Sequence, residues 1–358
     1  MNLQWQKYPH NARKLFKLTI PIFISQLSAS GMGLADIVMA GLVSDDDVSA
    51  IAVSNSIYFP LFLFVLGLLN AITPTVSYLN GSNQRHLIAH QVRQGFWLVL
   101  TMSIPLILIF CNSHLILDYM HTPKSFSSKS QQYLMIMAIG IVPALLAINL
   151  RCMNDGLSNP KPAMIITFFG LVLNIPLNYI FIFGKFGLPE MGSVGCGIAT
   201  AIVNWVMFLM MFYYCYTNKS QRDIGLFSKW MEMPSGQTLL KICKLGLPIG
   251  FATFTEVMLF STSALFLSPL GAQVVASHQA ALQTSSLFFM IPMSFSIATT
   301  IVIGQTLGQK RLDDAKVLSY HALLTGFMFA CLAAVVIVLL DKYIPLAFTR
   351  DPLSISIA

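Results

Sequence analysis

The sequence predicts an all-helical protein that crosses a membrane many times, and three observations support this fold class. First, 56% of the 358 residues are hydrophobic and 10% are charged, whereas a soluble domain carries about 25% charged residues. Second, the mean hydropathy is +0.71, and the apolar residues form runs near the ~20 residues that a helix needs to cross a bilayer. Third, the basic residues gather in alternate loops, as in polytopic membrane proteins.

Nine apolar segments predict nine membrane spans. They cover residues 18–42, 49–79, 94–117, 132–150, 162–183, 192–216, 243–267, 273–305 and 317–340. Placing the 21 Lys and Arg on alternate sides of these spans puts 16 on the side of the N-terminus and 5 on the other. The positive-inside rule then places the N-terminus in the cytoplasm. The net charge of +7 follows from this topology, and we expect no nucleic-acid partner.

The first part of the chain recurs at an offset of 227 residues. Residues 17–22 and 244–249 share the pattern Lys-Leu-x-x-Pro-Ile. Further identities at the same offset are Val48 with Val275, Phe62 with Phe289, Ala71 with Ala298, Thr73 with Thr300 and Gly81 with Gly308. Six spans separate the starts of the two copies, so both copies begin on the same side of the membrane. The pattern predicts a duplication with parallel topology.

The duplication predicts two lobes that face each other across a central cavity. Residues 1–230 would form a complete six-helix N-terminal lobe with its connecting loop. Residues 231–358 would form about three helices of a C-terminal lobe. The first copy has 227 residues and the second has 115, so spans four to six have no counterpart in the second copy. We therefore expect a fragment or a truncated product, and an unequal ancient duplication is the alternative.

Two acidic residues fall inside the predicted spans, Asp36 in the first and Glu256 in the seventh. The other 12 of the 14 acidic residues lie in loops or near span ends, and no Lys or Arg lies in the middle of a span. A buried carboxylate without a basic partner must be neutralised by a proton, a metal ion or a cationic ligand. Acids inside a bilayer are functional candidates, and a permanently protonated carboxyl is the alternative. Ser263 occupies the repeat position of Asp36, so the two lobes do not carry the same site.

The fifth and sixth spans carry polar residues that could share a cation with the embedded acid. Asn174 and Asn178 are four residues apart and therefore lie on one helix face. Cys196 and Thr200 have the same spacing in the sixth span. Polar residues that merely join helices are the alternative interpretation. Oxygen atoms suited to a hard cation such as Na⁺ are carried by Asp36, Asn174, Asn178 and Thr200.

A group of polar residues in the eighth span is a candidate lining for a substrate cavity, although such residues also bridge helices. The group consists of Gln279, Gln283, Thr284 and Ser285. The 19 Met and 26 Phe suit a plastic cavity for cationic aromatic small molecules. The six cysteines lack the spacing of disulfides or metal ligands. Nucleotide-binding and hydrolase motifs are absent, so we expect no enzyme and no cofactor besides a coupling ion.

Five stretches of the sequence match a known pattern, namely Ala35–Gly41, Lys161–Met164, Leu173–Asn178, Gly192–Thr200 and Lys244–Glu256. In these stretches the sequence resembles a family of transporters, the multidrug and toxic compound extrusion (MATE) family, in its NorM-like branch. The resemblance implies a two-lobe MATE-like bundle in the bacterial cytoplasmic (inner) membrane. It implies export of cationic drugs, hence antibiotic resistance, in exchange for Na⁺ or H⁺ by alternating access.

The resemblance also assigns residues. It implies a first-lobe cation site at Asp36, Asn174, Asn178, Cys196 and Thr200, and a second-lobe acid at Glu256. NorM-like proteins also use an aspartate in their tenth helix, and the sequence ends before that helix. The second-lobe site is therefore expected to be incomplete.

The favoured function is a secondary antiporter that acts as a monomer in contact with membrane lipids. A lipid-precursor flippase of related fold is the first alternative, and it should carry Arg or Lys in its cavity to hold an anionic pyrophosphate lipid. An inactive truncated product is the second alternative.

Overall fold

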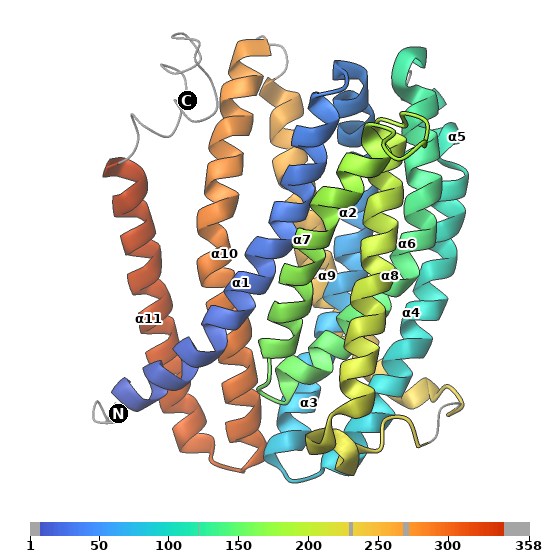
Figure 1. Cartoon of the computed structure of the whole chain (residues 1–358). Coiled ribbons are helices and arrows are strands. Elements are labelled where there is room, and N and C mark those ends of the chain that lie inside the picture. Colours follow the sequence, from blue (N-terminus) through green and yellow to red (C-terminus); the bar gives the residue numbers. More distant parts are fainter. Residues whose placement is uncertain (1–7, 121, 229–231, 268–271, 340–358) are drawn as a thin grey trace.

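The protein is a bundle of long helices that run side by side (Figure 1). The computed structural model describes residues 8–120, 122–228, 232–267 and 272–339, and every regular element in these ranges is a helix. The elements are α1 (Tyr8–Gly41), α2 (Asp45–Asn70), α3 (Ile72–Gly81), η2 (Arg85–Leu87), α4 (Ile88–Cys111), α5 (Ser113–Tyr119), α6 (Lys124–Gly156), α7 (Lys161–Ile182), α8 (Ser193–Thr217), η3 (Lys219–Ile224), α9 (Gly236–Leu267), α10 (Ala272–Gly308) and α11 (Leu312–Leu339).

Nine helical segments among the described residues are long and apolar enough to cross a membrane, so the predicted all-α class and number of spans are confirmed. Helices α2 and α3 together make one span, Asp45–Gly81, with a break at Ala71. The fourth span, Phe126–Gly156, extends beyond its predicted end and takes in Arg151 and Asp155. The loops at residues 82–87, 157–160 and 309–311 lie at the lower end in Figure 1. We call it the basic end, because most Lys and Arg belong to this side.

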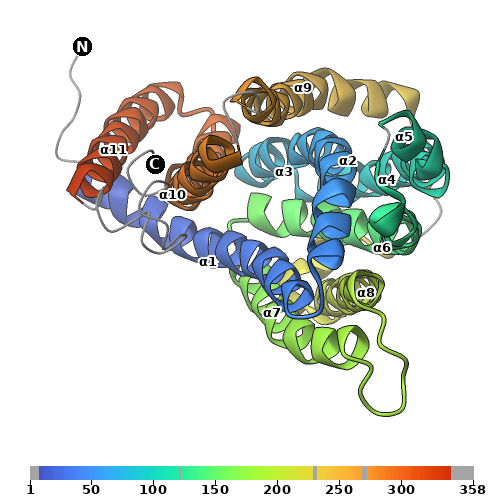
Figure 2. The same ribbon diagram turned by 90° about the horizontal axis from the view of Figure 1, so that it is seen from above.

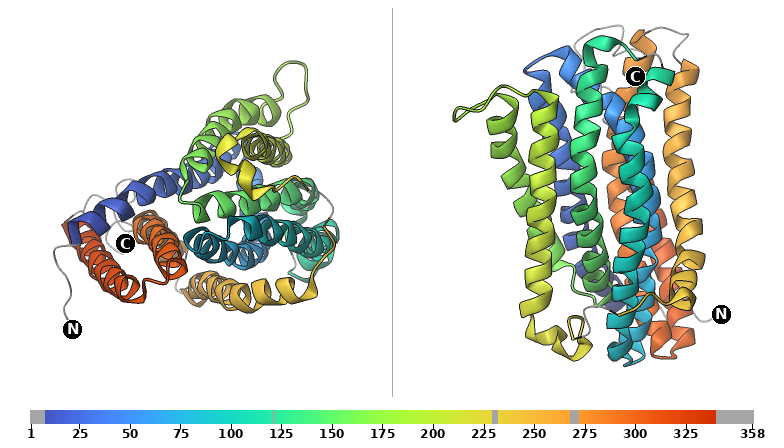
Figure 3. Two further views of the ribbon diagram at one scale, coloured as in Figure 1. Left: turned by 90° about the horizontal axis from the view of Figure 1, so that it is seen from below. Right: turned by 90° about the vertical axis from the view of Figure 1, so that its right-hand side faces the viewer.

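Two apolar cores hold the bundle together. The larger core surrounds α6, which packs against α2, α4 and α8. The smaller core joins the first half of α1 to α10 and α11 through Leu15, Leu18, Ile22, Phe295, Ala298, Ile301, Val302, Leu318 and Ala322. Helix α1 therefore runs across the molecule, from α10 and α11 at one end to α7 at the other (Figure 2). On the opposite side, α9 lies along α2 and touches α4 (Figure 3).

The outer surface of the bundle is apolar. Leu108 of α4 and Phe168 of α7 have 58% and 54% of their surface exposed. A protein in water rarely exposes large contiguous apolar patches, whereas hydrocarbon solvates such side chains at no cost. The exposed apolar residues are thus the lipid-facing surface of the spans.

At the basic end, the backbones of α3 and α10 come into contact at two glycines, Gly81 and Gly308. The contacting residues occupy equivalent positions in the two copies of the 227-residue repeat. A Cβ on Gly81 would collide with the carbonyl oxygen of Gln305, and a Cβ on Gly308 would collide with that of Tyr78. Gly81 is the repeat partner of Gly308, and Tyr78 is that of Gln305. Any larger side chain at either glycine would force the two helices apart. The basic end is therefore closed between α3 and α10.

The segment between η3 and α9 is bound to α4 by polar contacts. Arg93 Nε donates to Glu232 Oε2 at 2.6 Å, and His90 Nδ1 lies 2.6 Å from Glu232 Oε1. Trp97 Nε1 donates to the backbone oxygen of Glu232 at 2.8 Å. Burial raises the pKa of the Glu232 carboxyl, but the hydrogen bonds from His90 and Arg93 outweigh it and leave this pKa below its usual value. The connection between the two repeats is thus fixed to the first of them.

The closed contact can be tested with cysteine pairs in a variant that lacks the six native cysteines. A Cβ built on Gly304 would lie 2.8 Å from Ser77 Cβ, so the two helices need to part by only about 1 Å to reach the ~3.5–4.5 Å that a disulfide needs between its Cβ atoms. With a protease site inserted after Ser228, the Ser77→Cys/Gly304→Cys chain should stay in one piece on a non-reducing gel after cleavage. Most of the protein should be cross-linked. The control pair Ser77→Cys/Gly326→Cys should separate, because Gly326 has open space around it. Equal separation of both pairs would contradict the closed arrangement.

Candidate functional site

The Asp36 carboxylate lies where α1, α7 and α8 meet, and uncharged side chains hold it. Oδ1 accepts hydrogen bonds from Asn178 Nδ2 at 2.6 Å and from Asn174 Nδ2 at 3.1 Å. Oδ2 accepts from Thr200 Oγ1 at 3.0 Å. The Cys196 thiol lies within electrostatic range of the same carboxyl. The structure therefore brings together all five residues that the sequence assigned to the first-lobe site.

Helix periodicity explains this convergence. Asn174 and Asn178 lie one turn apart on α7, and Cys196 and Thr200 lie one turn apart on α8, so each pair presents two side chains to the same point. Helices α7 and α8 pack against each other, and α1 packs along α7. A hydrogen bond of 3.2 Å between the hydroxyls of Ser25 and Thr167 adds a second polar link between α1 and α7.

Burial makes this carboxylate unusual. Asp36 is 6% exposed, and Asn174, Asn178 and Cys196 are fully buried. Among the described residues, no ion pair joins Asp36 to a basic side chain. Hydrogen bonds from neutral groups only partly replace the water that a charged carboxylate loses on burial. The site therefore favours any proton or small cation that can reach it.

The atoms around Asp36 fit such an ion. The buried Oδ1 atom of Asn178 has no hydrogen-bond partner among the described residues. Asn174 Oδ1 accepts only from Asn178, at 3.1 Å, within the site itself. Carboxylate, amide and hydroxyl oxygens are the ligands that hard cations prefer. No group of three or more His, Cys, Asp or Glu that could hold a metal occurs in the described ranges, so a Na⁺ ion here would depend on the amide and hydroxyl oxygens.

One residue near this site was not identified from the sequence. Tyr133 of α6 is 3% exposed and lies within electrostatic range of both Asp36 and Cys196. A Cβ on Gly197 of α8 would come within 3.1 Å of its ring. A tyrosine in an apolar run gives no sequence signal, because the same residue also suits a plain packing position.

The other predicted site residues lie elsewhere. Glu256 is on α9, inside the span Gly236–Phe260, with an exposed side chain, and it does not join the hydrogen bonds of Asp36. Ser285 is exposed on α10. The side chains of Gln279, Gln283 and Thr284 lie outside the described part of the structure, so the predicted cavity lining stays a prediction.

Two acidic residues that the sequence placed in loops or near span ends are buried. Asp47, in the first turn of α2, is 1% exposed, and Asp155, near the end of α6, is 4% exposed. Asp155 Oδ2 accepts from Arg151 Nε at 3.4 Å. The same guanidinium donates to Gln26 Oε1 of α1 at 3.3 Å. This arginine is thus a basic residue within a span, and it is engaged by an acid of its own helix.

Asp47 connects the outer ends of three helices, opposite the basic end. Its Oδ1 accepts from the backbone nitrogen and the hydroxyl of Ser193, both at 2.8 Å, and its Oδ2 accepts from Lys129 Nζ at 2.9 Å. Gly192 precedes Ser193 with φ +54°, and a Cβ there would collide with the Asp47 carboxylate. This contact fixes the start of α8, the helix that carries Cys196 and Thr200.

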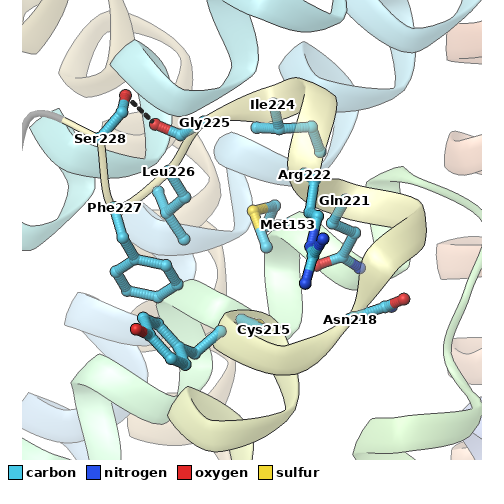
Figure 4. A pocket seen from close by; sticks show the side chains of 11 residues that line it. Met153, Cys215, Asn218, Gln221, Arg222, Ile224, Gly225, Leu226, Phe227 and Ser228 are labelled. Atoms are coloured by element: carbon cyan, nitrogen blue, oxygen red, sulfur yellow. Dashed lines mark hydrogen bonds between the residues drawn. The ribbon is translucent and has the colours of Figure 1, made fainter.

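Three described cavities lie away from Asp36. One, of about 230 Å³, is enclosed by the end of α8, η3 and the segment that follows (Figure 4). Phe227 and Arg222 belong to its wall, and Ser228 Oγ donates to the Gly225 oxygen at 2.7 Å. A second, of about 260 Å³, lies between α4, α6 and α8 and is mainly apolar. A third, of about 230 Å³, lies at the basic end beside α1 and α7.

The fold is that of the solved MATE transporters. A eukaryotic MATE transporter, AtDTX14, superposes with a TM-score of 0.88 at 18% identity, over 98% of this chain and 77% of that one. A multidrug resistance MATE family transporter in an outward-facing conformation superposes with a TM-score of 0.84 at 19% identity, over 95% of this chain and 75% of the other. These likenesses show the fold class of the chain.

The chain belongs to the MATE family, and its closer relatives are of the NorM type. The sequence model named MatE matches residues 21–180 and 248–358. The probable multidrug resistance protein NorM of Haemophilus ducreyi is 81% identical over 358 residues, all of this chain and 77% of that protein. The multidrug resistance protein MdtK of Yersinia enterocolitica is 47% identical over 97% of this chain and 76% of that protein.

We expect the buried hydrogen bonds from Ser193 to Asp47 to contribute more to the stability of the fold than the ion pair between Asp47 and Lys129. Asp47→Ala should lower the free energy of unfolding by about 3 kcal/mol, because it removes both carboxylate oxygens and leaves the backbone nitrogen and the hydroxyl of Ser193 without their acceptor. Lys129→Gln should cost about 1 kcal/mol or less, because the lysine side chain is 39% exposed. Thermal unfolding of both purified variants in detergent measures the difference. Equal losses would show that the salt bridge, and not the buried hydrogen bonds, carries the contact.

Proposed function

We propose that this chain is an ion-coupled exporter of organic cations and that the Asp36 carboxylate is its ion-binding group. The observation that carries the proposal is a buried carboxylate held by Asn174, Asn178 and Thr200, with no basic partner among the described residues. A proton or a cation that neutralises the charge of such a group stabilises it strongly. The names of the relatives, multidrug resistance proteins, support drugs as the exported class.

The proposed coupling acts through the three helices at the site. With the carboxylate charged, its two oxygens accept hydrogen bonds from α7 and α8 at the same time. A proton on one oxygen would remove an acceptor, and a Na⁺ ion would turn the amide oxygens of Asn174 and Asn178 towards itself. Either event changes how α1 is bound to α7 and α8. Ion binding therefore biases the lobes between two arrangements, and drug release follows the same change.

The orientation and the two lobes are part of the same proposal. The basic end would face the cytoplasm, so the contact between α3 and α10 would close the cytoplasmic side. Residues 1–230 would form one lobe, and residues from 231 onward would belong to the other. Glu256 of α9 would then be the acidic group of the second lobe, acting without the oxygens that surround Asp36.

The flippase alternative receives little support. A carrier of pyrophosphate lipids needs free positive charge deep within its spans, where the substrate crosses. Arg151, a basic residue of the fourth span, is instead hydrogen-bonded to both Asp155 and Gln26. Among the described residues, no comparable contact neutralises Asp36, so the site favours cations over anions.

The proposal is tested by ethidium efflux from cells that express the chain. The native chain should lower cellular ethidium below that of cells with the empty vector. Asp36→Asn should abolish this efflux, because an amide neither binds a proton nor carries the charge that attracts a cation. Asp118→Asn, a change at an exposed acid of α5, should leave it intact.

Two outcomes would contradict the proposal. Efflux that persists at the native rate in the double variant Asp36→Asn/Glu256→Gln would exclude coupling through these acids. Absence of efflux by the native chain at normal expression would exclude an exporter. Repeating the assay in Na⁺-free and in Na⁺-containing media at two pH values identifies the coupling ion.

A further inference from the structure

A small cavity at the basic end gathers positive charge from two helices. Its volume is about 230 Å³, below the ~300–1,000 Å³ of sites for drug-sized ligands. Its wall consists of Lys14, Lys17 and Leu18 of α1, Ser158, Asn159 and Pro160 of the α6–α7 loop, and Lys161, the first residue of α7. The cavity has the size of a polar head group and not of an exported drug.

The charge in this cavity is not balanced from within. None of the described residues in its wall is acidic. None of the ion pairs among the described residues includes Lys14, Lys17 or Lys161. Arg311, which pairs with Asp314, lies close enough to repel Lys14. Three like charges in one hollow raise the local positive potential and attract an anion.

The surroundings of the cavity differ from those of a site for a soluble anion. Lys14 and Lys17 lie in the first turns of the span Ala12–Gly41, and the ends of a span belong near the surface of the bilayer. One turn further into the span, Ile20 of α1 is 56% exposed and Ile165 of α7 is 59% exposed. On α7, Phe168 continues this apolar surface. An amphiphile would meet lysines at its head and apolar side chains along its tail.

We propose that this cavity binds the phosphate of an anionic phospholipid, whose acyl chains lie along α1 and α7. Basic pockets at the membrane surface between helices are sites of this kind. The inference is independent of the proposed export function, because it depends only on charge, depth and the apolar surface of the spans. It does have a mechanical consequence. Ser158 in the cavity wall accepts a hydrogen bond of 2.7 Å from Gln305 of α10, so the lipid would brace the closed contact between α3 and α10.

The test compares lipids retained by the purified chain in native mass spectrometry. The chain is equilibrated in detergent with phosphatidylglycerol and with phosphatidylcholine. The triple variant Lys14→Gln/Lys17→Gln/Lys161→Gln should bind phosphatidylglycerol on the order of 100-fold more weakly, with phosphatidylcholine unaffected. The control variant Lys219→Gln/Lys241→Gln/Lys316→Gln removes the same charge at the basic end but outside the cavity. It should retain the native preference.

Three results would overturn the proposal. Equal loss in the control variant would show general attraction to basic residues and no specific site. Displacement of the lipid by inorganic phosphate at millimolar concentration would show a site for a soluble anion. If the triple variant unfolds in detergent with phosphatidylcholine, the single variants Lys14→Gln, Lys17→Gln and Lys161→Gln are measured in its place. Each should bind phosphatidylglycerol roughly fivefold more weakly than the native chain. Single variants that all bind as the native chain does would also overturn the proposal.

Discussion

A carboxylate buried in a membrane bundle without a basic partner is the constraint on which this account depends. The Asp36 carboxylate can remain buried only because Asn174 and Asn178 of α7 and Thr200 of α8 donate hydrogen bonds to its two oxygens. The arrangement holds the charge without neutralising it. A site that was fully neutralised would have no reason to respond to an ion, and a site without donors could not remain charged in a buried position.

The three buried acids of the described structure are held in three different ways. Asp36 meets neutral donors, Asp47 meets a lysine and the start of α8, and Asp155 meets Arg151 of its own helix. Asp47 and Asp155 each have a basic partner, which suits a structural role. Only Asp36 combines deep burial with neutral partners, so it is the group whose protonation or ion binding would change the fit of its helices.

The sequence predicted the membrane class, the nine spans and the residues around Asp36. Spacing of four residues in α7 and in α8 defines a face, and an acid without a base in an apolar run is a strong signal. Other features depended on packing between distant segments. Asp47 looks like a loop acid until α6 and α8 pack against it. Asp155 lies near the end of its helix and gives no sign of burial in the sequence, and Tyr133 is one aromatic residue among many. The exposure of Glu256 depends on which helices cover α9, which its own sequence does not encode.

The most direct test of the central claim is infrared difference spectroscopy of the purified chain between acid and alkaline pH. In Na⁺-free buffer, a band of a protonated carboxyl group in an apolar setting should appear at acid pH and be absent in Asp36→Asn. Added Na⁺ should weaken this band if the same oxygens bind the ion. A spectrum identical in the native chain and in Asp36→Asn, at every pH and Na⁺ concentration, would contradict the account.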